Sequence, residues 1–197
     1  MMPEGARRDT GCMVIGETLS GEGVLSGLSS LLAKSGAATE IFCEVPGEAL
    51  HPALQRGYQR VRLHCRQSAI AAAGGGCDAA LALAGQLPVD RLALVTGSFG
   101  GEPPRGPRRR IRSYARRNAA FCVAEVLILQ FGPAEGWLEL EPLARALCNC
   151  RIHGVRLSET AWTNGKEQMK NALCGFLCAG VLPKSLAERA EMCIIYE

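Results

Sequence analysis

The sequence predicts an α/β fold, a three-layer sandwich on a mostly parallel six-stranded sheet. Short apolar runs alternate with segments whose apolar residues recur every three or four positions, which is typical of strands joined by helical crossovers. The runs 92–95 and 126–129 are apolar throughout, as strands covered on both faces are. With 197 residues, 48% of them hydrophobic and 21% charged, the chain has the composition of one globular domain, so we expect a single domain over 1–197.

Six apolar runs predict the strands of this sheet. Each is short and aliphatic and is bounded by glycine, proline or polar residues. In chain order the predicted strands are 12–16, 39–45, 69–74, 91–96, 125–131 and 151–157. A further apolar run, 193–196, is expected to form an edge strand or a contact with a partner.

Between the strands, apolar residues recur at helical spacing. In the segment 52–67, one face of a helix would carry Leu54, Tyr58, Val61 and Cys65. Gly36 is the expected stop of the helix that follows the first strand. In chain order the predicted helices are 24–32, 52–67, 77–87, 109–123, 138–147 and 166–179, with a short one in the tail 183–197.

A triple glycine at 74–76 separates an apolar strand from a helix. Glycine permits the strained backbone of a sharp strand-to-helix turn, and Cys77 and Asp78 follow directly. A side chain at the apex of such a turn is expected to project into solvent. The helix N-terminus beside it would favour thiolate and lower the pKa of a thiol. Cys77 is therefore the candidate nucleophile.

The order of elements resembles the α/β-hydrolase fold, in a minimal form without its first two strands or a cap domain. The resemblance covers roughly residues 12–179. Residues 75–79 (Gly-Gly-Cys-Asp-Ala) resemble the nucleophile elbow G-x-S-x-G, with cysteine in place of serine. Residues 44–47 (Glu-Val-Pro-Gly) are similar to a D-x-P-G that often ends a strand in the family. The resemblance implies the strand order 2-1-3-4-5-6 and a crevice where that order reverses, above the first and third strands.

The catalytic triad that the resemblance implies is incomplete in this chain. Glu135 is the carboxylate near the expected position of the acid. The loop after the last strand, 158–162, lacks the expected histidine, because His51, His64 and His153 all lie elsewhere in the sequence. The resemblance is therefore to a degenerate member that lacks the triad histidine.

Two loops would bound the implied crevice. The main-chain N–H groups of Asp78 and of the loop that carries Glu17 would hold an oxyanion, and Gly16 and Gly76 would line the same space. Trp162, in the loop after the last strand, is a candidate pocket residue.

Arginines give the strongest local charge of the chain. The segment 105–123 predicts an amphipathic helix with a basic outer face, in the place of a cap. Its candidate anion-binding residues are Arg109, Arg110, Arg112 and Arg116. An anionic ligand or an acidic partner would fit this face, and an ordinary solvated helix is the alternative. Nucleic acid is disfavoured, because the patch is short, no aromatic residues interleave in it as stacking platforms, and the chain has a net charge of only +3.

The ten cysteines carry information about compartment and metals. Residues 1–10 are polar, are expected to be flexible and do not resemble an export signal, and no apolar segment is long enough for a membrane span. We therefore expect free thiols in the cytoplasm. The cysteine spacings do not match a zinc site, so neither a metal nor a cofactor is predicted. A homodimer is among the assemblies that the sequence allows.

Three functions stay open at this point. The first is hydrolysis of small esters or thioesters through Cys77, with a missing or non-standard base. The second is a catalytically inactive relative that keeps the crevice to bind a small ligand or a protein partner. The third is a flavodoxin- or Rossmann-type nucleotide binder. The glycine spacing at 74–76 disfavours this third function, because it does not match G-x-G-x-x-G.

Overall fold

The computed structural model describes residues 8–16, 25–42, 52–74, 76–97, 123–131, 150–182, 184 and 192–196. Within these residues the strands form one seven-stranded sheet in the order β2-β1-β3-β4-β5-β6-β7. The strands are β1 (Arg8–Ile15), β2 (Ala38–Phe42), β3 (Cys65–Ala73), β4 (Val89–Gly97), β5 (Val123–Phe131), β6 (Arg151–Leu157) and β7 (Met192–Tyr196).

The first six strands are parallel, and β7 pairs antiparallel with β6. The predicted fold class and the strand order 2-1-3-4-5-6 are therefore confirmed. The apolar run 193–196 lies in β7, so the edge-strand alternative is the correct one for this segment.

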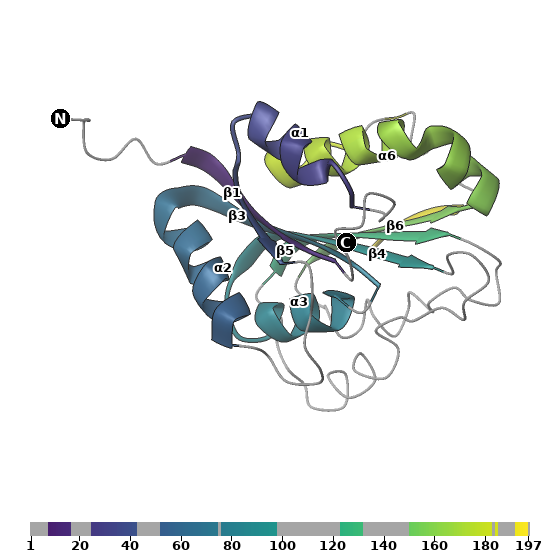
Figure 1. The fold of residues 1–197 in the computed structure, drawn as a ribbon. Coiled ribbons are helices and arrows are strands. Elements are labelled where there is room, and N and C mark those ends of the chain that lie inside the picture. Colours follow the sequence, from purple (N-terminus) through teal and green to yellow (C-terminus); the bar gives the residue numbers. More distant parts are fainter. Residues whose placement is uncertain are drawn as a thin grey trace.

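Helices cover both faces of the sheet (Figure 1). They are α1 (Leu28–Lys34), α2 (Pro52–His64), α3 (Gly76–Ala84) and α6 (Glu159–Ala179). Helices α1 and α6 lie on one face, and α2 and α3 lie on the other. Because side chains alternate along a strand, β3 contributes Ile70 and Ala72 to the core under α2 and α3, and Ala71 and Ala73 to the core under α1 and α6.

The two largest shifts in where a strand begins, in β1 and β3, have the same reason. Strand β1 begins at Arg8 rather than Cys12, inside the segment 1–10 that was expected to be flexible. Strand β3 begins at Cys65, inside the predicted helix 52–67. Arg8 pairs with Cys65 in the parallel ladder between these strands. Pairing between distant segments thus extends both strands, and a local apolar period does not reveal it.

The last long helix starts earlier than predicted. It begins at Glu159 and consists of two helices that meet in a kink at Gly165, whose φ of −121° and ψ of 15° are not helical, so the second of them matches the predicted helix 166–179. Trp162 consequently falls within α6 rather than in a loop after β6. The loop expected over 158–162 was therefore wrong.

Other predicted features lie outside the described residues. They are the loop carrying Glu17, the basic helix 105–123, the helix 138–147, Glu135 and the tail helix. Among the helices that the structure does describe, none combines the length and apolar character that a membrane span requires.

Candidate functional site

In the turn that precedes α3, Gly74 adopts a left-handed backbone conformation. This residue has a φ of 54°, a region that glycine enters without the steric cost of a Cβ. The Gly74 N–H donates to the Val95 carbonyl oxygen (3.2 Å), and the Cys77 N–H donates to the Gly74 carbonyl oxygen (3.2 Å). Cys77 itself lies inside α3. Gly74, a positive-φ position of the described part of this turn, lies three residues before the cysteine, whereas a nucleophile elbow strains the nucleophile itself.

Gly76 allows α3 to start directly against the end of β1. A Cβ on Gly76 would lie 2.9 Å from the carbonyl oxygen of Ile15, which is too close for any side chain without a backbone shift. A Cβ on Gly16, the next residue of that strand end, would meet nothing within 4 Å. The structure therefore brings Gly16 and Gly76 together at the carboxyl edge of the sheet, and no described residue lies within 4 Å of a Cβ on Gly16.

Cys77 points into the core and not into solvent, so the expectation of an exposed thiol was wrong. The residue is 0% exposed. Its sulfur lies 3.5 Å from the carbonyl oxygen of Ala72 and 3.6 Å from that of Val95, and its single S–H has either oxygen as acceptor. The physical reason is its place in α3, where the Cα–Cβ bond of Cys77 tilts back toward the helix N-terminus and the side chain faces the sheet.

Neither described histidine faces this thiol. His153 alternates with Ile152, which belongs to the core under α2 and α3. Its ring packs edge-on against Phe176 of α6, with 6.0 Å between ring centroids, and thus lies on the other face of the sheet from Cys77. His64 is exposed at the end of α2. Helix α2 runs from the carboxyl edge to the amino edge, so His64 is remote from the turn before α3.

Asp78 is half-buried in the first turn of α3, where a carboxylate interacts favourably with the helix N-terminus. The other predicted crevice residues cannot be placed beside it. Glu17 and Glu135 lie outside the described residues, as do Arg109, Arg110, Arg112 and Arg116, and the Trp162 side chain is likewise outside them. The structure therefore assembles only Gly16, Gly76, Cys77 and Asp78 of the predicted site.

A separate group of thiols lies on the opposite face of the sheet. Cys174 and Cys178 of α6 lie near Cys12 of β1, and the Cys174 sulfur lies 3.3 Å from the hydroxyl oxygen of Ser35. Burial, followed by the neighbouring Cys174, raises the pKa of the Cys178 thiol to about 11. Burial likewise raises the pKa of Cys12. Thiols that stay protonated are weak nucleophiles, so these cysteines serve the packing of α6 on β1.

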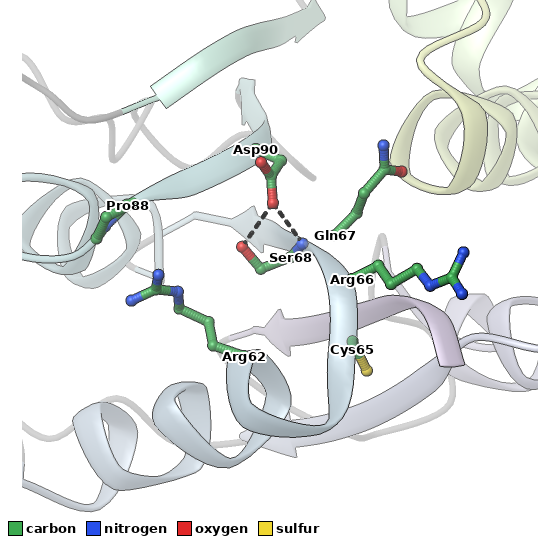
Figure 2. Close-up of a pocket in the computed structure, with 7 residues that line it drawn as sticks. All are labelled: Arg62, Cys65, Arg66, Gln67, Ser68, Pro88 and Asp90. Atoms are coloured by element: carbon green, nitrogen blue, oxygen red, sulfur yellow. Dashed lines mark hydrogen bonds between the residues drawn. The ribbon is translucent and has the colours of Figure 1, made fainter. Parts of the chain in front are cut away.

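The structure has a hollow at the amino edge of the sheet, which sequence reasoning missed. It encloses about 260 Å³ between the end of α2 and the starts of β3 and β4 (Figure 2). Its lining residues are Arg62, Cys65, Arg66, Gln67, Ser68, Pro88 and Asp90. We call it the amino-edge pocket.

A hydrogen-bond network forms the floor of the amino-edge pocket. The Ser68 N–H (2.7 Å) and hydroxyl (3.0 Å) both donate to Oδ2 of Asp90. Behind them, the Tyr58 hydroxyl lies 2.9 Å from the Ser68 hydroxyl oxygen and 2.8 Å from the Pro88 carbonyl oxygen. Burial raises the pKa of Tyr58, and its hydrogen bond with Ser68 and the nearby Arg62 act in the opposite direction. Tyr58 is therefore neutral, and it holds the floor in place.

A misplaced helix end hid this pocket in the sequence. The prediction continued the helix through Gln67, whereas Ser68 is the fourth residue of β3 and faces Asp90 on β4. The usable signal was the polar run Arg66-Gln67-Ser68, which interrupts the apolar face of a helix. Among the residues that the structure describes, no group of three or more His, Cys, Asp or Glu side chains has a geometry suited to a metal ion.

The comparisons with known proteins found a distant structural likeness. The fold is similar to a solved α/β hydrolase from Sphaerobacter thermophilus DSM 20745, with a TM-score of 0.49, 14% identity and coverage of 86% of this chain and 93% of that chain. No family model matches the chain, and no curated protein matches it. The fold assignment therefore rests on the sheet order and the helix layers described above.

Proposed function

We propose that this chain is a catalytically inactive α/β-hydrolase-like protein that binds a small ligand in a crevice at the carboxyl edge of β1 and β3. The observation that carries the first half of this proposal is the burial of Cys77, which is 0% exposed. A nucleophile has to reach a substrate carbonyl carbon, and a sulfur beneath the sheet edge does not.

The surroundings of the Cys77 sulfur support the same conclusion. The carbonyl oxygens of Ala72 and Val95 accept a hydrogen bond from a thiol. The same oxygens would repel a thiolate, because their dipoles present negative charge to the sulfur. The site thus favours the form of cysteine that is not a nucleophile.

The crevice itself is supported by topology and by open space. Strand β1 lies between β2 and β3, so the chain leaves β1 and β3 toward opposite faces of the sheet. Ligands of open α/β sheets bind at such a reversal, outside the carboxyl ends of the strands. Gly16 lies there, and among the described residues a Cβ on it would meet nothing within 4 Å.

The inactive assignment is tested with activated esters and acyl thioesters, comparing the wild type with Cys77→Ala. We expect no turnover above background from either protein. In parallel, a maleimide should modify the half-buried Cys178 of the native protein well before Cys77, and unfolding should abolish the difference, as mass spectrometry of the labelled peptides would measure. Turnover in the wild type that disappears in Cys77→Ala would instead establish a cysteine hydrolase.

The binding half needs a variant that fills the crevice. A library of small carboxylic acids, esters and amides can be screened by ligand-observed NMR, and its hits compared between Gly16→Trp and the control Gln86→Trp. Gln86 is exposed in the turn after α3, at the opposite edge of the sheet. We expect hits to be lost in Gly16→Trp alone. Hits that bind Gly16→Trp as well as wild type would place the ligand elsewhere.

Three further predictions accompany this proposal. An anionic ligand or acidic partner at Arg109, Arg110, Arg112 and Arg116 is one, cytoplasmic location is the second, and organisation as a single domain is the third. The anion-binding prediction would be tested by replacing all four arginines with glutamine in one variant and comparing its retention on a phosphate-bearing resin with that of the wild type. Unchanged retention would indicate an ordinary solvated surface.

A further inference from the structure

The amino-edge pocket carries two opposite charges that do not pair with each other. Figure 2 shows Arg62, from α2, and Asp90, from β4, on opposite sides of Ser68. Both charges act on the Tyr58 hydroxyl, Arg62 lowering its pKa and Asp90 raising it. Within the described part of the chain, no ion pair joins Arg62 to Asp90. Arg62 and Asp90 thus line the same hollow without forming an ion pair with each other.

The carboxylate of Asp90 is held in a fixed orientation by buried groups. Ser68 is 5% exposed and Tyr58 is 0% exposed. Both hydrogen bonds from Ser68 go to Oδ2, so Oδ1 takes no part in tying Asp90 to Ser68. A carboxylate oriented by a buried serine and tyrosine loses little conformational entropy on binding, and such preorganisation increases affinity.

The neighbouring arginine Arg66 does not share this arrangement. In Figure 2 its side chain points away from Asp90, and its guanidinium lies 3.8 Å from the carboxylate of the exposed Asp9. Gln67 is also engaged elsewhere, because its side-chain oxygen accepts a hydrogen bond from Arg91 at 3.0 Å. Arg62 and Asp90 are therefore the charged groups of this pocket that are positioned to bind a ligand.

We infer that the amino-edge pocket binds a small zwitterion of the free α-amino-acid class. The ligand carboxylate would pair with the Arg62 guanidinium, which offers a planar set of N–H donors. The ligand ammonium group would donate to Oδ1 of Asp90. A volume of about 260 Å³ is many times the ~10–15 Å³ that one water needs on the same measure, so the hollow accommodates a small molecule such as an amino acid.

The test measures binding of free α-amino acids by isothermal titration calorimetry and thermal shift. For each amino acid that binds, the matching amine without the carboxylate and the matching acid without the ammonium group are titrated beside it, together with inorganic phosphate. We expect saturable binding of at least one amino acid. Each single-charge analogue should bind at least about tenfold more weakly, which is about 1.4 kcal/mol.

Three variants localise the binding. Arg62→Gln removes an exposed guanidinium, and Asp90→Asn keeps an acceptor for Ser68 while removing the charge. Each should weaken binding at least about tenfold. Arg56→Gln, an exposed arginine on α2 that does not line the pocket, is the matched control and should bind as the wild type does. If Asp90→Asn does not fold, Arg62→Gln alone decides the question.

Several results would overturn the inference. They are no saturable binding of any amino acid at millimolar concentration, equal binding by Arg62→Gln and wild type, and phosphate binding as tightly as the best amino acid. The last would mean a simple anion site. The inference is independent of the crevice proposal, since Gly16→Trp alters the other edge and should leave amino-acid binding unchanged.

Discussion

The two edges of the sheet solve different packing problems. At the carboxyl edge, Gly76 brings α3 against the Ile15 carbonyl, and Cys77 turns its thiol into the core. At the amino edge, polar groups meet: Tyr58, Ser68 and Asp90 form a hydrogen-bonded network beside a hollow of about 260 Å³. At the carboxyl edge, a glycine without a side chain allows close backbone packing, whereas the amino edge is stabilised by hydrogen bonds between side chains.

This contrast shows that a sequence motif can resemble a reactive site without forming one in the structure. The glycines and the cysteine at 74–77 look like a reactive turn, yet in the structure they meet the demands of close packing. The groups with unpaired charge and fixed orientation lie at the opposite edge, in a stretch with no recognisable motif. In this chain, contacts between residues in the structure are therefore a better guide to function than the spacing of glycines in the sequence.

The largest expected effect is that of Gly76→Val, which attacks the packing of the carboxyl edge. The new side chain would begin 2.9 Å from the Ile15 carbonyl oxygen, so α3 has to move, and we expect a loss of about 3 kcal/mol in the free energy of unfolding. Urea denaturation measures it. Gly16→Ala, where a Cβ meets nothing within 4 Å, should change stability by less than about 0.5 kcal/mol. Equal stability of the two variants would contradict the close approach.

Tyr58→Phe tests the amino-edge network and ranks second. It leaves the Pro88 carbonyl oxygen without the tyrosine donor at 2.8 Å and removes the group 2.9 Å from the Ser68 hydroxyl. Because Tyr58 and Ser68 are buried, we expect a loss of about 2 kcal/mol. Thermal and urea unfolding should agree on it. Ser35→Ala, which removes an exposed hydroxyl, is the comparison, and a loss no larger than in that variant would mean that the network contributes no stability.

A pair of glycine substitutions sharpens the description of the amino edge. Gly36 and Gly180 have φ values of 84° and 68°, so alanine at either position should cost about 1 kcal/mol from the left-handed backbone alone. At Gly180 the Cβ would also lie 2.9 Å from Oε2 of Glu125 and 3.1 Å from Nε of Arg91. We expect Gly180→Ala to cost about 2 kcal/mol in total. Equal losses for the two variants would show that Arg91 and Glu125 simply move aside.

The smallest effect comes from His153, which belongs to neither edge. Burial first, and Arg151 less, lower its pKa from 6.5, while Glu125 raises it. The unfolded chain therefore takes up the proton before the folded one, and stability falls as pH drops below about 6.5. His153→Gln should flatten the dependence of Tm on pH by less than about 2 °C. The prediction would be contradicted if the Tm of the wild type rose relative to that of His153→Gln as the pH drops below about 6.5.

The sheet was predictable because its signals are local. The apolar runs that form β4 and β5 are bounded by polar residues, and parallel strands joined by helices leave few orders open. The start of β3 was not predictable in the same way. Cys65 continues the apolar spacing of α2, and only its pairing with Arg8 of β1 assigns it to a strand.

The candidate sites depended still more on distant contacts. The direction of the Cys77 side chain depends on contacts with the sheet, where its sulfur lies near the carbonyl oxygens of Ala72 and of Val95, a residue of the neighbouring strand. The amino-edge pocket requires Ser68 to meet Asp90, 22 positions away. No local pattern encodes either contact.

The placement of β1 inside the sheet and of β7 at its edge gives these two strands unequal resistance to pulling. Strand β1 is bonded on both sides, to β2 and β3, whereas β7 is bonded to β6 as the last strand of the sheet. Force applied to β7 would peel its hydrogen bonds one after another, while force along β1 would shear two ladders at once. The sheet is mechanically soft where β7 joins it and stiff along β1.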